Sequence, residues 1–386
     1  MGFRLLRPDE AAGTARRAAV CFGAELDDAA VERWRGLLDR EEVWGLTDAA
    51  DRVLAHGRLR RVDHWLLGRR VPTQHVASVA VPPEHRGSGV AAELMRAAVR
   101  QGASAGSGLS LLFPATVALY RRLGYEHAGA LPRYRLDARA APAVGPALRR
   151  AEGDADWAAI RMCGDRAASR LHGPAVRPAD RWAQLRDSAY HYVLDATDGL
   201  DAYVLFDHRR EPGDWQYTLS ITDWGALSAR GLAGVVGLVG RHGTVGKAAT
   251  FRGPVPEVWS FLVAEQDVAQ VSRLWWMARG LDLDAAIAHR GFPVGLTASV
   301  TLAVDDPLLP DHQGPWRLEV AGGRGTLEPA PDADVRLDAR AVGPLVTGFR
   351  TPRDLVLADL AAGPPAALEV LGAAFAGPVP VIQDFF

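Results

Sequence analysis

A glycine-rich turn stands between a predicted strand, residues 74–81, and a predicted helix, residues 90–101, and it fits the pattern R-x-x-G-x-A. Glycines let a ligand come close to the backbone. A helix N-terminus has unpaired N–H groups and about half a positive charge, so this turn can bind a pyrophosphate. The alternative is a glycine turn that only begins a helix. The turn consists of Arg86, Gly87, Ser88, Gly89, Val90 and Ala91.

The strand before the turn is predicted from the alternation of its β-branched residues. An exposed strand backbone can pair with an extended ligand in the way that an added strand pairs with a sheet edge. Val79, Ala80 and Val81 are the residues placed to do this. The strand and the turn together therefore predict a site for a phosphate-bearing ligand with an extended arm.

At this point the sequence resembles the GCN5-related N-acetyltransferase superfamily, whose cofactor motif has this strand, turn and helix. The resemblance implies that acetyl-CoA binds here and that its acetyl group passes to an amine. The superfamily's general acid commonly lies in a segment Tyr-x-x-x-Gly-Phe/Tyr, and residues 120–125 match this pattern. The resemblance therefore assigns the acid role to Tyr120 and a structural role to Tyr125. A phenol with a pKa near 10 can protonate a departing thiolate of pKa about 8.5. The alternative for Tyr120 is an aromatic ring packed under the cofactor.

Three segments, 79–86, 119–125 and 375–386, resemble more narrowly the Eis (enhanced intracellular survival) acetyltransferases. This resemblance implies a mixed α/β, or α+β, fold with two tandem domains of the acetyltransferase fold and a domain resembling sterol carrier protein. It implies that only the first domain is catalytic. The expected domains are residues 1–143, 144–285 and 286–386.

The end of the chain also takes a role from this resemblance. Members of the family end in a phenylalanine whose α-carboxylate reaches the first domain's active site, and this chain ends in Phe386. A free α-carboxylate has a pKa of about 3.3 to 3.7, so burial or a relaying water would have to help it act as a base. The alternative is a frayed, solvated tail. Val379, Val381, Ile382, Phe385 and Phe386 are apolar and argue against fraying.

The acceptor pocket is predicted only in part. Phe22 and Trp34 match aromatic residues of the family's pocket, while Ala24 replaces an expected acidic residue. The resemblance implies a small polycationic acceptor, similar to an aminoglycoside or a polyamine, and the alanine argues against an aminoglycoside. Glu25 and Asp384 are candidates to pair with a cationic acceptor, and the alternative for Glu25 is a solvated surface carboxylate.

Direct attack of a neutral amine on the thioester is the predicted mechanism, because neither cysteine lies near the motif and no Ser-His-Asp grouping is evident. By resemblance, the N–H of Val79 would bind the oxyanion, the Phe386 carboxylate would take the amine proton, and Tyr120 would protonate the coenzyme A sulfur.

The composition excludes other classes of protein. A net charge of -2 provides no basic field for nucleic acid or an anionic membrane. Cys21 and Cys163 are far apart and outside any zinc spacing, so we expect two buried thiols, no disulfide and no metal site. No signal peptide or membrane span is evident, which predicts a cytoplasmic protein.

Further elements follow from periodicity and turn residues. An arginine-rich turn is expected at 58–61 and a linker at 140–146. The expected helices are 9–22, 117–123, 157–170, 341–349 and 354–360, and the expected strands are 109–113, 190–194, 202–207, 217–223, 297–304, 316–320 and 334–338.

Two other functions stay open at this stage. A transferase of the same fold would use a longer acyl-CoA, or acetylate a natural-product amine or a protein lysine. A lipid-binding or scaffold protein would use the third domain, with the first domain inactive. Relatives assemble as hexamers, so resemblance also predicts a homo-oligomer.

Overall fold

The first part of the chain, residues 1–137, forms one half of the sheet that carries the glycine turn. The computed structural model describes every residue from Met1 to Phe386. This half contains the helices α1 (Ala11–Phe22), α2 (Asp28–Asp39), α3 (Val90–Ser104) and α4 (Val117–Arg121). Its strands are β1 (Gly2–Leu5), β2 (Val43–Thr47), β3 (Val53–Leu66), β4 (Arg69–Ala80), β5 (Leu109–Leu112) and β6 (Glu126–Asp137).

The middle of the chain repeats the order of helix and strands. Its helices are α5 (Gly153–Ser169), α6 (Ala179–Arg186) and α7 (Ala229–Arg241). Its strands are β7 (Arg149–Arg150), β8 (Tyr190–Ala196), β9 (Gly199–Arg209), β10 (Tyr217–Ala226), β11 (Gly246–Phe251) and β12 (Val268–Gly280).

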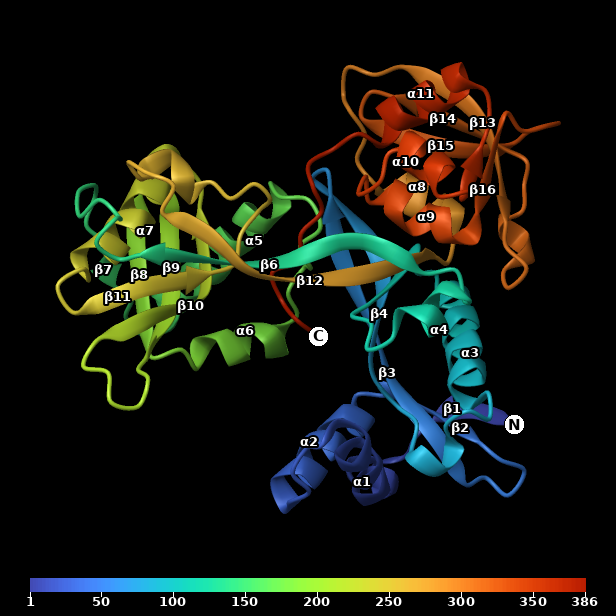
Figure 1. Cartoon of the computed structure of the whole chain (residues 1–386), viewed down its shortest axis with the longest axis horizontal. Coiled ribbons are helices and arrows are strands. Elements are labelled where there is room, and N and C mark those ends of the chain that lie inside the picture. Colours follow the sequence, from blue (N-terminus) through green and yellow to red (C-terminus); the bar gives the residue numbers. More distant parts are fainter.

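Both halves share one twelve-stranded sheet, in the order β1-β2-β3-β4-β5-β12-β6-β11-β10-β9-β8-β7. The halves exchange strands, because β12 pairs with β5 and β6, whereas the end of β6 pairs with β11. In Figure 1, β6 and β12 run side by side across the middle of the molecule and join the two halves. The segment 140–146, expected as a linker, lies between β6 and β7 and contacts α7 through Gly237 and Gly240.

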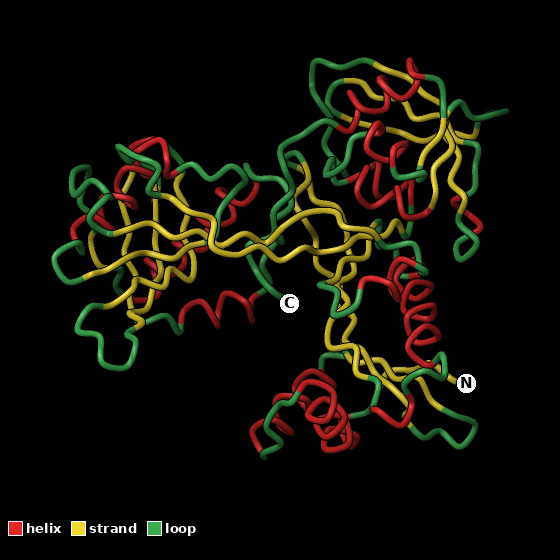
Figure 2. The backbone as a smooth tube through the Cα atoms, in the orientation of Figure 1, coloured by secondary structure: helices red, strands yellow, loops and turns green.

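The last part of the chain forms a separate five-stranded sheet in the order β15-β14-β13-β16-β17. Its strands are β13 (Ala298–Asp305), β14 (Trp316–Ala321), β15 (Arg324–Pro329), β16 (Val335–Asp338) and β17 (Ala361–Ala362), and its helices are α8 (Leu283–His289), α9 (Ala339–Val346), α10 (Pro352–Leu357) and α11 (Pro365–Phe375). Along the chain, α8 precedes the strands β13 to β16, which α9, α10, β17 and α11 follow; Figure 2 shows these helices and strands together in one compact part of the backbone trace. The mixed α/β class expected from the sequence is confirmed.

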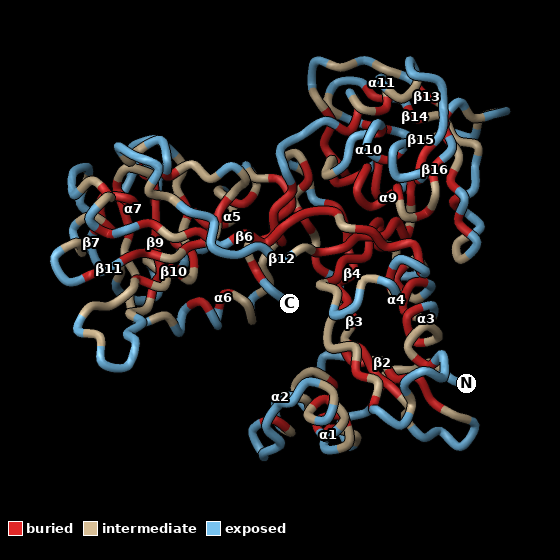
Figure 3. Tube along the Cα trace, viewed as in Figure 1, coloured by how far each residue is buried: buried red, intermediate tan, exposed pale blue.

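The largest apolar core connects this last part to the central sheet. Leu66, Val71 and Leu109, from β3 to β5, belong to the same cluster of 29 buried residues as Leu302 and Phe375. In Figure 3 the buried stretches of chain run along the central strands and into the C-terminal part. The core therefore fixes the C-terminal part against strands β3 to β5 of the sheet.

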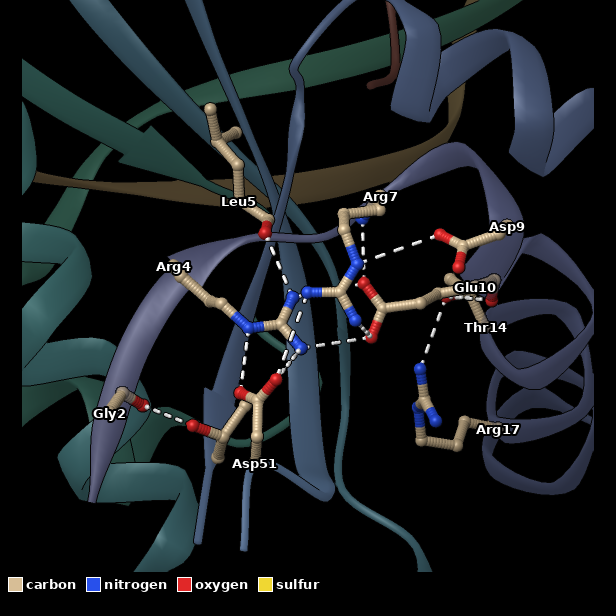
Figure 4. A network of polar contacts seen from close by, with 10 residues as sticks. Gly2, Arg4, Leu5, Arg7, Asp9, Glu10, Thr14, Arg17 and Asp51 are labelled. Carbon is tan, nitrogen blue, oxygen red and sulfur yellow. Dashed lines mark hydrogen bonds and ion pairs between the residues drawn. The ribbon is translucent and has the colours of Figure 1, made fainter. Parts of the chain in front are cut away.

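Helix α1 is anchored at its start by a network of polar contacts (Figure 4). The guanidinium group of Arg4 on β1 donates to Glu10 at 2.9 and 3.0 Å and to Asp51 at 2.8 and 3.0 Å. Further along α1, Arg17 donates to Thr14 and to Nδ1 of His56 on β3. These contacts hold α1, and α2 beside it, at one edge of the site described below.

Two expectations about single segments were wrong. Residues 58–61 are not a turn but the middle of β3, where Arg58 and Arg60 are neutralised by Glu42 and Asp180 and can therefore stay on a strand. Cys21 is half-exposed near the end of α1, whereas Cys163 is buried as expected. Among all the helices, none combines the length and the apolar character that crossing a bilayer requires.

Candidate active site

Strands β4 and β5 diverge next to the glycine turn. They pair in parallel only from Thr73 to Val76 on β4, and Ser78 then takes a left-handed conformation with φ of +49°. The pairing of β4 with β3 shifts register at the same place, as a β-bulge does. No strand pairs with Ala77 to Ala80 on the β5 side. The expected ligand-binding residues Val79 and Ala80 thus lie on an unpaired strand edge, which suits an extended ligand.

The turn after β4 presents unpaired backbone donors. The N–H groups from Gly87 to Ala92 donate to no acceptor in the chain, and the N-cap of α3, Gly89, provides no side-chain cap. Gly87 and Gly89 have φ of +76° and +85°, and an added Cβ would meet no atom within 4 Å at either position. Arg86 is exposed and donates through Nε to the carbonyl oxygen of Val81 at 3.1 Å. The turn is therefore open toward solvent and suits a pyrophosphate.

The two tyrosines of the expected acid segment have different surroundings. Tyr125 is fully buried and donates to Ser110 Oγ at 2.8 Å, and burial raises its pKa to about 12. The phenol hydroxyl of Tyr120, on α4, forms no hydrogen bond within the chain, and burial raises its pKa as well. Tyr120 packs in the same core cluster as Val76 and Leu112, the last paired residues of β4 and β5. A free phenol therefore lies beside the point where the strands diverge.

The C-terminal tail is not frayed. Val381 forms a parallel bridge with Ala130 of β6, and its N–H donates to the carbonyl oxygen of His172 at 2.8 Å. The carbonyl oxygen of Gln383 accepts from Arg252 Nη1 at 2.7 Å. Both halves of the sheet thus hold the tail.

The last residue, Phe386, lies beside the gap between β4 and β5. Its ring stacks on the imidazole of His75 with centroids 3.5 Å apart, and it lies 5.2 Å from the ring of Phe113, which follows β5. Because successive residues of a strand point to opposite faces, His75 and Val76 are on opposite sides of the sheet. Phe386 therefore approaches the gap from one face, and Tyr120, packed with Val76, from the other.

The imidazole under Phe386 is uncharged. Burial lowers the pKa of His75 well below its usual range, and burial lowers the pKa of His64 to about 4. Nε2 of His64 lies 2.6 Å from Nε2 of His75, and Nδ1 of His64 lies 2.7 Å from the carbonyl oxygen of Gly173. Because neutral His64 donates its Nδ1–H to the carbonyl oxygen of Gly173, its Nε2 carries no proton and accepts. Nε2–H of His75 is then the donor in the hydrogen bond between the two rings. No imidazolium therefore neutralises the nearby α-carboxylate.

A cavity of about 510 Å³ opens in front of Phe386. It is lined by α2, β3, β4, the segment 175–184 and the tail 384–386. Glu32, Arg33 and the arginines of β3 in this wall could not be predicted from the sequence, because they face one cavity only after the two halves of the sheet meet. No three His, Cys, Asp or Glu side chains come together in a way that could hold a metal ion.

The expected acceptor residues are only partly brought together. Phe22 and Glu25 are exposed and do not line the cavity, and Trp34 instead packs its edge against the ring of His56. Asp384 does line the cavity, but its carboxylate already pairs with cations of the chain itself. Both of its oxygens are already bound by arginines.

Asp384 instead fixes the tail. It accepts from Nε of Arg177 at 2.7 Å and from Nε of Arg181 at 2.8 Å, and Arg177 also binds Asp223. Burial alone would raise the pKa of Asp384, but the two arginines outweigh it and lower the pKa to about 2. The carboxylate is therefore ionised at neutral pH and holds the last residues in place.

An acid-sensitive tail is expected from this pKa. The pKa of Asp384 is lower in the folded chain than the value near 3.9 expected in the unfolded chain, so ionised Asp384 stabilises the fold by about 2 kcal/mol at a pH well above 3.9. This stabilisation is lost as the pH falls toward 2. Asp384→Asn should lower the thermal unfolding midpoint at pH 6, and its difference from wild type should shrink between pH 5 and 2.5. A difference that stays constant with pH would contradict this. Asp9→Asn, an exposed acid on the surface, is the control.

The equivalent gap in the middle part of the chain is filled. Strands β10 and β11 also pair in parallel over part of their length, but Trp259 stacks on Phe251 with centroids 3.8 Å apart and packs edge-on against Trp224. The next helix, α7, has Ser228 as its N-cap, and the hydroxyl of Ser228 accepts from the N–H of Gly231 at 3.0 Å. This half has neither an open gap nor a glycine turn.

Comparisons with known proteins agree with this geometry. Residues 2–128 match the model of an acetyltransferase (GNAT) domain, residues 173–279 match a second such domain, and residues 283–383 match a sterol carrier protein domain. A GCN5-related N-acetyltransferase from Kribbella flavida is 30% identical over 100% of this chain and 98% of its own, with a TM-score of 0.87. The chain belongs to the GCN5-related N-acetyltransferases. A search among curated proteins gives no match.

Other members of the family have the same architecture. A GCN5-related N-acetyltransferase from Anabaena variabilis is 25% identical over the whole of both chains, with a TM-score of 0.92. Eis1 from Mycobacterium abscessus is 22% identical over the whole of both chains, with a TM-score of 0.81, and shares the fold. As a GCN5-related N-acetyltransferase, this chain is an acyltransferase with acetyl-CoA as co-substrate. The expected order of two acetyltransferase domains and a sterol-carrier domain is confirmed.

Proposed function

We propose that the chain acetylates a primary amine by direct attack on acetyl-CoA, with Tyr120 as the acid and the α-carboxylate of Phe386 as the base. One observation carries the proposal: the gap between β4 and β5 has a free phenol beside it on one face and the fixed chain terminus on the other. An amine that enters from the cavity meets the carboxylate, while the departing sulfur meets the phenol.

Each group has one task in this mechanism. The unpaired edge from Ala77 to Ala80 binds the pantetheine arm, and the N–H groups of the glycine turn bind the pyrophosphate. The N–H of Val79 donates to the oxygen that becomes negative as the amine attacks. The Phe386 carboxylate, directly or through a water, takes the amine proton, and Tyr120 gives its proton to the sulfur. The carbon–nitrogen bond forms as the carbon–sulfur bond breaks, so no acyl-enzyme arises.

The other parts of the chain have supporting roles in this proposal. We propose the domain limits 1–143, 144–285 and 286–386, with the middle domain non-catalytic because Trp259 fills its gap. A lipid-binding role has less support, since apolar side chains fill the interior of the C-terminal part. A hexamer in the cytoplasm stays a prediction, and light scattering would measure the number of subunits.

Calorimetric titration with acetyl-CoA, followed by thiol release in the presence of amines, tests binding and chemistry separately. We expect saturable binding at one site per chain, and thiol release that depends on an added amine. Binding without transfer to any amine would contradict the proposed activity.

Gly89→Ala is expected to weaken acetyl-CoA binding about tenfold. A φ of +85° costs an alanine roughly 1–2 kcal/mol, so the turn must shift away from the conformation that presents its N–H groups. Calorimetry measures the effect. Gly106→Ala is a matched control, because Gly106 follows the other end of α3 with φ of +72° and equally open surroundings. Equal losses of affinity in both variants would show that the effect is a general loss of stability.

A further inference from the structure

The cavity in front of Phe386 has a wall rich in arginine. Only three acidic side chains line it, namely Glu32, Asp180 and Asp384. Six arginines line it, namely Arg33, Arg40, Arg58, Arg60, Arg177 and Arg181. A pocket for polycations would present carboxylates instead.

The acids in and behind this wall are already bound. Asp180 accepts from both Nη atoms of Arg60 at 2.8 Å. Glu42, just behind the wall, binds Nη2 of Arg58 at 2.6 Å and Nε of Arg60 at 3.2 Å. Asp384 is held by two arginines, as described above. The remaining acid of the wall, Glu32, is exposed and lies 3.3 Å from Arg35. The buried carboxylates are therefore committed to arginines and not to a cationic ligand.

Several guanidinium donors, in contrast, have no partner. The side chain of Arg33 forms neither an ion pair nor a hydrogen bond, and Nη1 of Arg58 donates to no acceptor, since Glu42 binds only Nε and Nη2 of Arg58. On β3, Arg58 and Arg60 lie opposite Ala77 and His75 of β4. Neighbouring strands are about 5 Å apart, and Phe386 stacks on His75, so these arginines lie close to the place where the amine meets the carboxylate.

We propose that the acceptor amine carries an anionic group, a carboxylate or a phosphate, which binds Arg33 and Arg58 while the amine faces Phe386. This inference rests on the proposed function and narrows its acceptor. The planar guanidinium group matches both anions with paired N–H donors. A polycation would find no uncommitted buried carboxylate side chain in the same wall, because Asp180 and Asp384 already pair with arginines.

A panel of amines measured by thiol release tests the proposal. β-Alanine and O-phosphoethanolamine are compared with their uncharged counterparts, β-alaninamide and ethanolamine, and with spermidine as a polycation. We expect kcat/KM to be at least about tenfold higher for one or both anionic amines. The two anionic probes separate carboxylate from phosphate recognition. Faster transfer to the neutral amines or to spermidine would overturn this inference and leave the proposed function intact, whereas no transfer to any amine would overturn both.

Variants of the wall test which residues select the anion. Arg33→Gln should raise KM for the anionic amine about tenfold and leave KM for its neutral counterpart unchanged. Arg16→Gln is the control, because Arg16 is exposed on the neighbouring helix α1, its side chain pairs with no acid, and it lies outside the cavity. Arg58→Gln should also raise KM for the anionic amine. If the Arg58→Gln protein does not fold, Arg33→Gln alone decides the test. Equal changes for both amines, or an equal effect of Arg16→Gln, would overturn the assignment.

Discussion

A chain extended beyond Phe386 by a short tag is expected to lose about a hundredfold or more in turnover and to bind acetyl-CoA unchanged. The tag turns the α-carboxylate into an amide, which is no base. Because residues 381–384 stay held by Ala130, His172 and the arginines, the cofactor groove should keep its shape. Steady-state thiol release and calorimetry measure the two quantities.

Two further proteins separate the carboxylate from the bulk of the tag. Deletion of Phe386 keeps a terminal carboxylate but moves it by about one residue, or roughly 3.5 Å, and should also lower turnover strongly. A tag before Met1 is the control, since β1 is the edge strand of the sheet. Full turnover in the C-terminally tagged protein would remove the carboxylate from the mechanism.

Tyr120→Phe is expected to lower kcat about a hundredfold, with little change in the affinity for acetyl-CoA. The variant keeps the ring in its core cluster and removes only the hydroxyl, which has no partner within the chain. Burial raises the pKa of Tyr120, so the phenol is protonated throughout the neutral range and the wild-type acid is lost only above a pH of about 10.

Tyr125→Phe is the control for this substitution. It removes a buried hydrogen bond to Ser110 and should lower stability by about 1 kcal/mol while kcat stays near the wild-type value. If both tyrosine variants had the same kcat, the hydroxyl of Tyr120 would have no role in the chemistry beyond packing.

Local signals explain what could be predicted from the sequence. The alternation along 74–81 and the glycines at 87 and 89 correctly indicated β4, the turn and α3, because each depends on residues close in the chain. The segment 58–61 was misread since its arginines are neutralised by Glu42 and by Asp180, which is more than a hundred positions away. No local pattern contains such a partner.

The acceptor wall could not be predicted for a related reason. Arg33 comes from α2, Arg58 from β3 and Arg181 from α6, and they face one cavity only once the strands are exchanged. The resemblance to the family predicted the roles of Tyr120 and Phe386. It also predicted carboxylates that bind a cationic acceptor, whereas the wall of the cavity in the structure is rich in arginine. The face of the strand on which each arginine lies, and the ion pairs between residues far apart in the chain, determine the charge of this pocket.

The exchange of β6 and β12 has a consequence for how the protein is made on the ribosome. Strand β5 is synthesised early and pairs with β4, yet its second neighbour in the finished sheet is β12, which ends at Gly280. Until β12 has been synthesised, β5 and β6 each have an edge with unpaired backbone N–H and C=O groups, which can pair with strands of other chains. Fragments that stop at the end of the first domain should therefore associate or aggregate, and productive folding should await synthesis of the central region.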